Sequence, residues 1–133
     1  MIYLDSNIFI YAAINNDRAG EKSRILIRKL LHEKRDIGTS SLTWDEIIYA
    51  IWKKEGKEKA LLEGKKFLQF PDLILFKADT IILAKAQELA EYYSLKPRDA
   101  IHAATALVNG IKEIASDDPD FDKVKQLKRI KLL

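Results

Sequence analysis

Very short apolar runs alternate with longer amphipathic stretches along this 133-residue chain, and the alternation limits the folds that it can adopt. Each run is long enough for a strand of three or four residues that is buried on both faces. Buried strands separated by helices predict an α/β protein, a three-layer α/β/α sandwich with a central, mainly parallel, short-stranded sheet. The expected strands cover residues 2–4, 37–39, 73–76, 113–115 and 129–132.

The longer stretches carry apolar residues at helical spacing, so each is expected to form a helix with one buried face. Some intervals between strands are long enough for two helices, which excludes a simple winding of one helix per strand. The last helix is expected to end at Asn109-Gly110, a common stop signal. The expected helices cover residues 8–13, 21–34, a stretch from 43 onward, 57–70, 82–93 and 97–108.

Composition narrows the class of protein. Hydrophobic residues make up 47% and charged residues 32%, as in a globular protein, and the length suits a single domain over residues 1–133. The absence of cysteine and the presence of only two histidines argue against disulfides and zinc, and are compatible with a cytoplasmic protein. No apolar run approaches the roughly 20 residues of a membrane span. The net charge of +3 favours an anionic partner only weakly.

Four acidic residues follow the expected strands or begin the next helix: Asp5, Glu46, Asp99 and Asp118. Taken singly, each suits an ordinary role at the start of a helix. Thr43 to Glu46 has the sequence of a capping box, and the three aspartates stand where caps and first-turn anions are common. One acid alone would therefore be interpreted as a helix cap.

Taken together, the four acids allow a second interpretation. Parallel strands place these turns at one edge of the sheet, so the carboxylates can converge. Clustered carboxylates repel one another unless they take up protons or a cation joins them. Oxygen-only ligands suit Mg²⁺ or Mn²⁺, and magnesium favours phosphate co-ligands. The residues alone leave both interpretations open, helix caps or a metal site for phosphoryl chemistry.

Four segments of the chain resemble the PIN-domain family, in particular the VapC-type toxins of toxin–antitoxin pairs. They are IYLDSNIFI at 2–10, SLTWDE at 41–46, LKPRDAIHAATA at 95–106 and IASDDPDF at 114–121. The resemblance implies a metal-dependent endoribonuclease that uses Mg²⁺ or Mn²⁺ and leaves 5′-phosphate and 3′-hydroxyl ends. It also implies a homodimer, held inactive by a small antitoxin whose C-terminal segment lies across the active-site groove.

The same resemblance implies a role for each acid. Asp5 and Asp99 would be the principal metal ligands. Glu46 would hold a second metal or orient the attacking water, and Asp118 would complete the site. All four are accordingly expected to be catalytic.

The segment after the fourth strand holds three aspartates, and the family pattern ranks them. It places the usual acid at Asp118, puts Asp117 on a variable position, and makes Asp120 an auxiliary ligand or a loop-ordering residue. Asn7 and Ser116 resemble polar supporting residues that orient the carboxylates through hydrogen bonds.

Other residues near these segments have two interpretations each. Arg98 would hold a substrate phosphate or pair with a neighbouring carboxylate. His102 is expected to be a buried or rim histidine with satisfied hydrogen bonds. Trp44 and Trp52 are better explained by packing in the core or against a partner than by stacking on bases.

Three other functions compete with the toxin. In a phosphatase or phosphoaspartyl enzyme Asp5 would be a nucleophile, but such sites usually have a second aspartate where this chain has Asn7. A non-catalytic PIN-like interaction module would be expected to have lost at least one of the four acids. An RNA-processing PIN nuclease without an antitoxin stays open.

Overall fold

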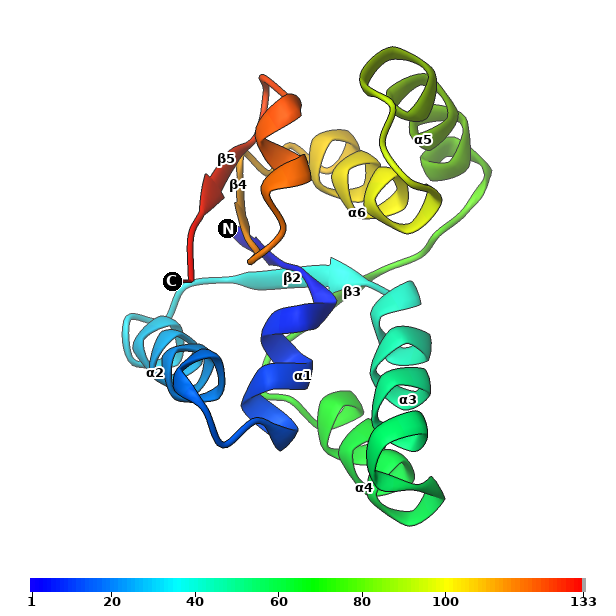
Figure 1. Ribbon diagram of the computed structural model, residues 1–133. Coiled ribbons are helices and arrows are strands. Elements are labelled where there is room, and N and C mark those ends of the chain that lie inside the picture. The colour runs from blue at the N-terminus through cyan, green and yellow to red at the C-terminus, as the bar shows by residue number, and fades with distance from the viewer. Residues whose placement is uncertain (133) are drawn as a thin grey trace.

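The computed structural model describes residues 1–132 and shows a parallel sheet between two layers of helices (Figure 1). The five strands follow one another across the sheet in the order β3-β2-β1-β4-β5. This confirms the predicted α/β sandwich and its short parallel strands. The strands are β1 (Ile2–Leu4), β2 (Ile37–Ser40), β3 (Ile74–Phe76), β4 (Glu113–Ala115) and β5 (Lys128–Ile130).

Helices α1 to α4 cover one face of the sheet, and helices α5 and α6 cover the other (Figure 1). A pair of helices fills each of the first three intervals between strands, as predicted, and a short 3₁₀ helix fills the last. No helix within residues 1–132 is long and apolar enough to cross a membrane. The helices are α1 (Ser6–Ile14), α2 (Arg18–His32), α3 (Leu42–Glu55), α4 (Lys57–Leu68), α5 (Thr80–Tyr93), α6 (Pro97–Val108) and the 3₁₀ helix η1 (Pro119–Lys123).

Three helices begin two or three residues earlier than hydrophobic periodicity predicts, because a polar residue caps each of them. Asp5 accepts a hydrogen bond from the Ser6 amide at the start of α1. Asp17 accepts one from Gly20 at the start of α2, and Asp79 accepts one from the third residue of α5. Such caps satisfy amide groups that have no partner inside the helix, so each helix can begin before its apolar periodicity does.

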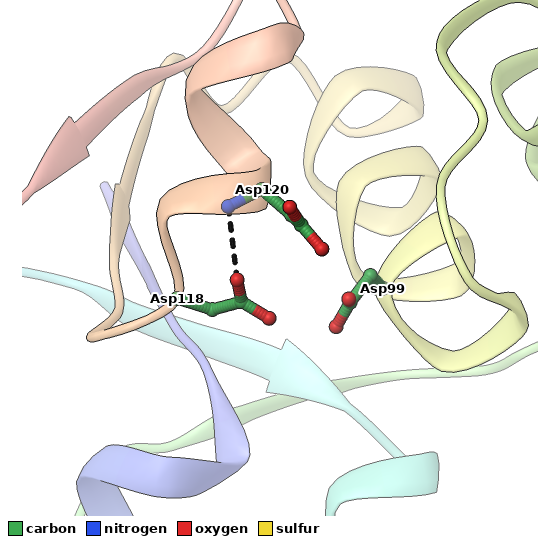
Figure 2. A group of neighbouring side chains, drawn as sticks. All are labelled: Asp99, Asp118 and Asp120. Carbon is green, nitrogen blue, oxygen red and sulfur yellow. Dashed lines mark hydrogen bonds between the residues drawn. The ribbon is translucent and has the colours of Figure 1, made fainter.

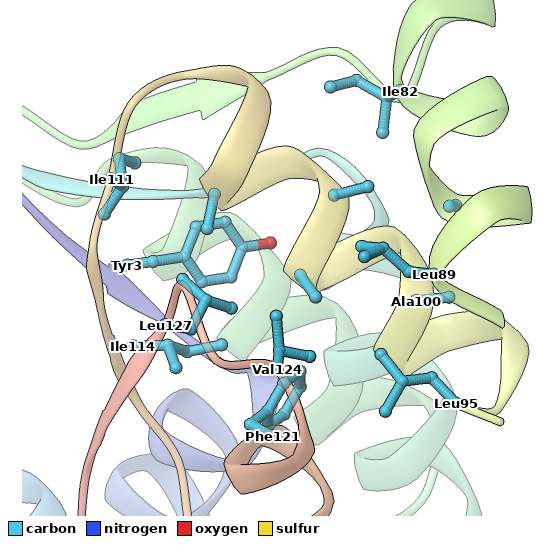
Figure 3. Packing of buried hydrophobic residues seen from close by; sticks show 14 residues of the cluster. Tyr3, Ile82, Leu89, Leu95, Ala100, Ile111, Ile114, Phe121, Val124 and Leu127 are labelled. Carbon is cyan, nitrogen blue, oxygen red and sulfur yellow. The ribbon is translucent and has the colours of Figure 1, made fainter. Parts of the chain in front are cut away.

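The central strand β1 sends alternate side chains into the two layers. Tyr3 packs in the core beneath α5 and α6 (Figure 3), whereas Ile2 and Leu4 belong to the core beneath α1 to α4. All three side chains are buried. Burial on both faces explains why the strand has an unbroken apolar sequence and no alternation with polar residues.

The point where the strand order reverses lies between β1 and β4. The chain builds the sheet outward from β1 through β2 to β3, and then returns to the other side of β1 to add β4. The Asp5 amide donates to the Ala115 carbonyl over 3.0 Å, so both strands end side by side. Ligand sites of open parallel sheets lie beyond the carboxyl ends of strands at such a reversal.

Helix α6 ends in the turn that leads into β4. Gly110 adopts a left-handed conformation, with φ of 71°. Its amide donates to the Leu107 carbonyl over 3.1 Å, and the Ile111 amide donates to the Ala106 carbonyl over 2.8 Å. These two bonds form a Schellman motif, which suits glycine at the left-handed position. The predicted stop at Asn109-Gly110 is confirmed.

Candidate active site

Three aspartates from two segments gather beyond the carboxyl ends of β1 and β4. Asp99 lies in the first turn of α6, whereas Asp118 and Asp120 lie at the start of η1. One carboxylate oxygen of each lies within 4.8 Å of the other two (Figure 2). All three side chains are partly exposed, so the cluster is open to solvent. Asp120 was expected to be an auxiliary residue. Its carboxylate lies close enough to that of Asp99 for both to bind one ion.

Asp118 combines its place in the cluster with the capping role that its sequence also predicted. One of its carboxylate oxygens, Oδ1, accepts a hydrogen bond from the Asp120 amide over 2.9 Å and so caps η1. The capping interpretation is confirmed for this residue, and its cap is compatible with its place in the cluster.

Asp5 is buried beside this cluster and is fixed by two donors. The Ser6 amide donates to its Oδ1 over 2.7 Å, and the Ser116 hydroxyl donates to its Oδ2 over 2.7 Å. The same Ser116 oxygen accepts from the Asp118 amide over 3.0 Å and from Asn7 Nδ2 over 3.4 Å. Ser116 thus connects Asp5 to the loop that carries the aspartate cluster, with Asn7 as a further contact.

The capping-box interpretation of Thr43 and Glu46 is wrong. Helix α3 begins after Ser41, whose side chain makes no capping hydrogen bond, and the Leu42 amide donates instead to the Ser40 hydroxyl over 3.1 Å. Thr43 is buried, and its hydroxyl forms a 2.7 Å hydrogen bond with the hydroxyl of Thr39 in β2. The Glu46 carboxylate points instead toward the opposite helical layer, where a side chain of α6 is its hydrogen-bond partner.

That partner is His102 of α6, whose side chain is completely buried. Its Nε2 lies 2.5 Å from Glu46 Oε1 and 3.6 Å from Asp5 Oδ1. Its Nδ1 lies 2.6 Å from the Tyr3 hydroxyl. The prediction of a buried, hydrogen-bonded histidine is confirmed. Tyr3 was not singled out by sequence reasoning, since a tyrosine inside an apolar strand is an ordinary core residue.

A family model described as PIN domain matches residues 2–127. The chain belongs to the PIN-domain family. This confirms the resemblance seen in the four sequence segments. Comparison with curated protein sequences gives no match.

Solved structures share the fold of this PIN domain over nearly their whole length. VapC20 of Mycobacterium tuberculosis, a Sarcin-Ricin loop cleaving toxin, matches with a TM-score of 0.79 at 15% identity, over 94% of this chain and 95% of that one. VapBC2 of Rickettsia felis, solved with promoter DNA, matches with 0.75 at 22% identity, over 98% of both chains. A toxin–antitoxin complex from Klebsiella pneumoniae matches with 0.69 at 18% identity, over 100% and 98%.

PIN-family nucleases typically use a divalent metal, and the residues of this PIN domain fit one. The clustered ligand atoms are carboxylate oxygens, which suit Mg²⁺ or Mn²⁺ and not a soft metal. Asn7 Oδ1, next to Ser116, is buried without a hydrogen-bond partner among the described residues. An unpaired buried acceptor is unfavourable, and an ion or its bound water would satisfy it.

The pKa shifts in the site of this PIN domain come first from burial and then from the charges of neighbouring side chains. Burial raises the pKa of Asp5. Burial, with the charges of Asp118 and Asp5, raises the pKa of Asp99 to about 6. Burial by itself would lower the pKa of His102, but its hydrogen bond to Glu46 and the charge of Asp5 raise it. A bound cation would lower the pKa of these carboxyl groups and favour their ionised form, and such shifted pKa values are common at functional sites.

Arg98 lies at the rim of the site. With Lys96, Pro97 and the two acids Glu46 and Asp99, it lines a pocket of about 510 Å³. Arg98 is exposed and forms no ion pair with any residue between 1 and 132. Of its two predicted roles, pairing with a neighbouring carboxylate is therefore not observed.

Asp117 does not join the aspartate cluster. Its carboxylate accepts a hydrogen bond from the Tyr11 hydroxyl of α1 over 3.3 Å. This contact agrees with its place on a variable position of the family pattern.

The two tryptophans of α3 do not lie in the core. Trp44 and Trp52 are 40% and 46% exposed, whereas Ile47 and Ile51 of the same helix are buried. The apolar face of α3 is therefore wider than the part of it that packs in the core, and the two tryptophans lie on the part that faces solvent. The core interpretation of these tryptophans is wrong.

Proposed function

We propose that this PIN domain is a Mg²⁺- or Mn²⁺-dependent endoribonuclease that hydrolyses RNA phosphodiester bonds as the toxin of a toxin–antitoxin pair. Residues 1–133 would form a single nuclease domain. The observation that carries the proposal is the gathering of Asp99, Asp118 and Asp120 beside the buried Asp5, with Ser116 joining the two parts. Four carboxylates at the strand reversal of a PIN fold form a site for hard cations and phosphates.

The acids would have two roles, to hold the metal ion and to orient the attacking water. Asp5, Asp99 and Asp118 would hold the ion, with Glu46 alongside and Asp120 as an auxiliary ligand. The bound ion supplies a water of lowered pKa and stabilises charge on the phosphate oxygens. Ser116 and Asn7 act by holding Asp5 and the Asp118 loop in place, as supporting groups around metal ligands do.

The substrate phosphate has a separate contact in this proposal. Arg98 and Lys96 present two cations on the rim of the pocket that Glu46 and Asp99 also line. An unpaired guanidinium can bind two oxygens of one phosphate at once. We assign Arg98 to a phosphate of the RNA strand.

Two protein partners complete the proposal, an antitoxin and a second copy of the chain. The structural likeness to chains from VapBC and other toxin–antitoxin complexes supports the antitoxin. The exposed face of α3, formed by Trp44, Tyr49 and Trp52, offers an apolar surface that a partner would cover. Without a cognate antitoxin, the same site would belong to an RNA-processing nuclease.

Cleavage of a labelled single-stranded RNA tests the proposal. We expect cutting with Mg²⁺ or Mn²⁺, none with chelator, and a loss of at least about 100-fold in Asp5→Asn and Asp99→Asn. Asp45→Asn is the matched control, because Asp45 is exposed on α3 and its carboxylate forms no hydrogen bond or ion pair within residues 1–132. The products should end in 5′-phosphate and 3′-hydroxyl.

Three results would contradict the proposal. Cutting that survives both substitutions would come from a contaminant. A 2′,3′-cyclic phosphate end would mean that the ribose hydroxyl attacks instead of water. If the protein neither cuts RNA nor binds Mn²⁺, the chain is a non-catalytic PIN scaffold.

A further inference from the structure

A buried hydrogen-bonded chain joins three distant segments at the edge of the proposed active site. Tyr3 lies on β1, His102 on α6 and Glu46 on α3. The two hydrogen bonds of His102 measure 2.6 Å to Tyr3 and 2.5 Å to Glu46. The Tyr3 ring is itself packed among the buried apolar residues under α5 and α6 (Figure 3), so the core holds the Tyr3 end of this series of hydrogen bonds in place.

The direction of this chain follows from the groups at its two ends. The Ser40 amide of β2 donates to the Tyr3 oxygen over 3.0 Å, so the phenolic hydrogen of Tyr3 remains free to be donated to His102 Nδ1 when the ring is neutral. An ionised Glu46 carboxylate can only accept, so His102 Nε2 must carry a hydrogen and donate it. In the neutral ring Nδ1 is then an acceptor for the Tyr3 hydroxyl, so the contact with Glu46 fixes the tautomer of His102.

Glu46 depends on this contact far more than Asp5 does. Among residues 1–132, His102 is the only recorded hydrogen-bond or ion-pair partner of the Glu46 carboxylate. Asp5 keeps its two short bonds, from Ser6 and Ser116, whatever happens to the histidine. Loss of the ring would therefore release Glu46 and leave Asp5 in place.

We propose that His102 is a positioning residue, which Tyr3 holds in the core and which in turn fixes the Glu46 carboxylate beside Asp5. The inference rests on the proposed nuclease function, because it gives Glu46 a defined place at the metal and water site. A long carboxylate side chain at a helix rim is otherwise free to adopt several rotamers. Outer residues that orient a metal ligand typically change metal affinity or activity by about 10- to 100-fold.

Two substitutions of His102 separate positioning from packing. In His102→Gln the amide nitrogen can occupy the place of Nε2 and still donate to Glu46. In His102→Asn the shorter side chain can occupy only the place of Nδ1, so it keeps the Tyr3 contact and loses Glu46. Both variants lose the aromatic ring, and a purely structural role predicts that both are impaired to a similar extent.

We expect His102→Gln to retain Mn²⁺ affinity and RNA cleavage within about threefold of the original protein, and His102→Asn to lose about 10- to 100-fold in each. Calorimetric titration of Mn²⁺ gives a readout independent of turnover. Thermal unfolding of both variants in chelator should show similar destabilisation. Equal losses of Mn²⁺ affinity in the two variants would overturn the proposal.

A magnetic resonance measurement tests the same contact without metal or substrate. The chain has only His32 and His102, and His32 is exposed, so ¹⁵N-histidine labelling gives two distinguishable rings. We expect a hydrogen on His102 Nε2 whose signal shifts strongly in Glu46→Ala. If His102 Nε2 carries no hydrogen, or if its signal is unchanged in Glu46→Ala, the positioning role is refuted. Failure of RNA cleavage alone would instead refute the nuclease.

Discussion

At the residue scale, the raised pKa of Asp99 leads to a prediction about the pH dependence of stability. Burial and the neighbouring carboxylates of Asp118 and Asp5 raise its pKa from 3.8 to about 6. Between these values the folded chain holds a proton that the unfolded chain has released. The group therefore stabilises the fold at low pH, and this contribution is lost as the pH rises through about 6.

We accordingly expect the metal-free protein to be less stable at about pH 7.5 than at about pH 5. Thermal unfolding in chelator across this range measures the effect. Asp118→Asn removes the neighbouring charge with the largest influence on Asp99, so the variant should lose less stability over the same range. Asp45→Asn, on an exposed carboxyl, should behave like the original protein. A pH dependence unchanged in Asp118→Asn would show that Asp99 and Asp118 do not interact.

The position of the acids after strands could be predicted from the sequence, but their partners could not. Asp5 and Asp118 follow strands that the short apolar runs predicted, so the edge of the sheet that they occupy was predictable. The capping-box interpretation of Glu46 was wrong because a capping box is a local pattern, whereas its actual partner His102 is 56 residues away. Tyr3 and His102 are 99 residues apart, and no local pattern connects them.

At the scale of elements, the close approach between α1 and α2 makes a sharper prediction than helix propensity does. A Cβ at Gly20 would lie 2.0 Å from the backbone oxygen of Asn15. Propensity alone predicts that Gly20→Ala stabilises α2 by about 1 kcal/mol. We expect the clash to dominate and the variant to be destabilised by about 2 kcal/mol, since backbone cannot move aside as a side chain can.

Gly64→Ala in α4 is the matched comparison for urea unfolding. A Cβ there would lie 2.4 Å from the terminal Cδ1 of Ile48, which can change rotamer. Its effect should stay within about 1 kcal/mol of the original protein. If both alanine variants unfold at the same urea concentration as the original chain, helices α1 and α2 are not packed as closely as described.

Element types could be predicted more completely than element limits. The apolar periodicity of α2 and α5 indicated helices at once, but their first two or three residues lie outside that periodicity and depend on the caps Asp17 and Asp79. For α3, periodicity marked one apolar face and could not show where contact with neighbouring elements stops. Trp44 and Trp52 lie beyond that limit, because burial is set by the layers as a whole.

At the scale of the whole molecule, the two helical layers differ in what they leave exposed. The layer that contains α3 presents Trp44, Tyr49 and Trp52 from a single helix, and Tyr49 and Trp52 line a pocket of about 540 Å³. The opposite layer exposes Tyr92, which lies 4.7 Å from Tyr93 between ring centroids and forms an edge-to-face pair with it. The aromatic face of α3 is thus the surface on which we expect the antitoxin.

Trp52→Glu tests this assignment, because a charge in the centre of an apolar contact opposes association. Trp52 shares α3 with Glu46 but does not line the pocket that Glu46 and Asp99 line. The toxin proposal expects a short reading frame directly upstream of the gene. Its product, co-expressed with tagged chain, should co-purify with the original protein and with the control Tyr92→Glu, and should be lost with Trp52→Glu. Metal-dependent RNA cleavage by purified Trp52→Glu should stay unchanged. Co-purification that survives Trp52→Glu would place the antitoxin on another surface, whereas loss in both variants would point to a general effect of added charge.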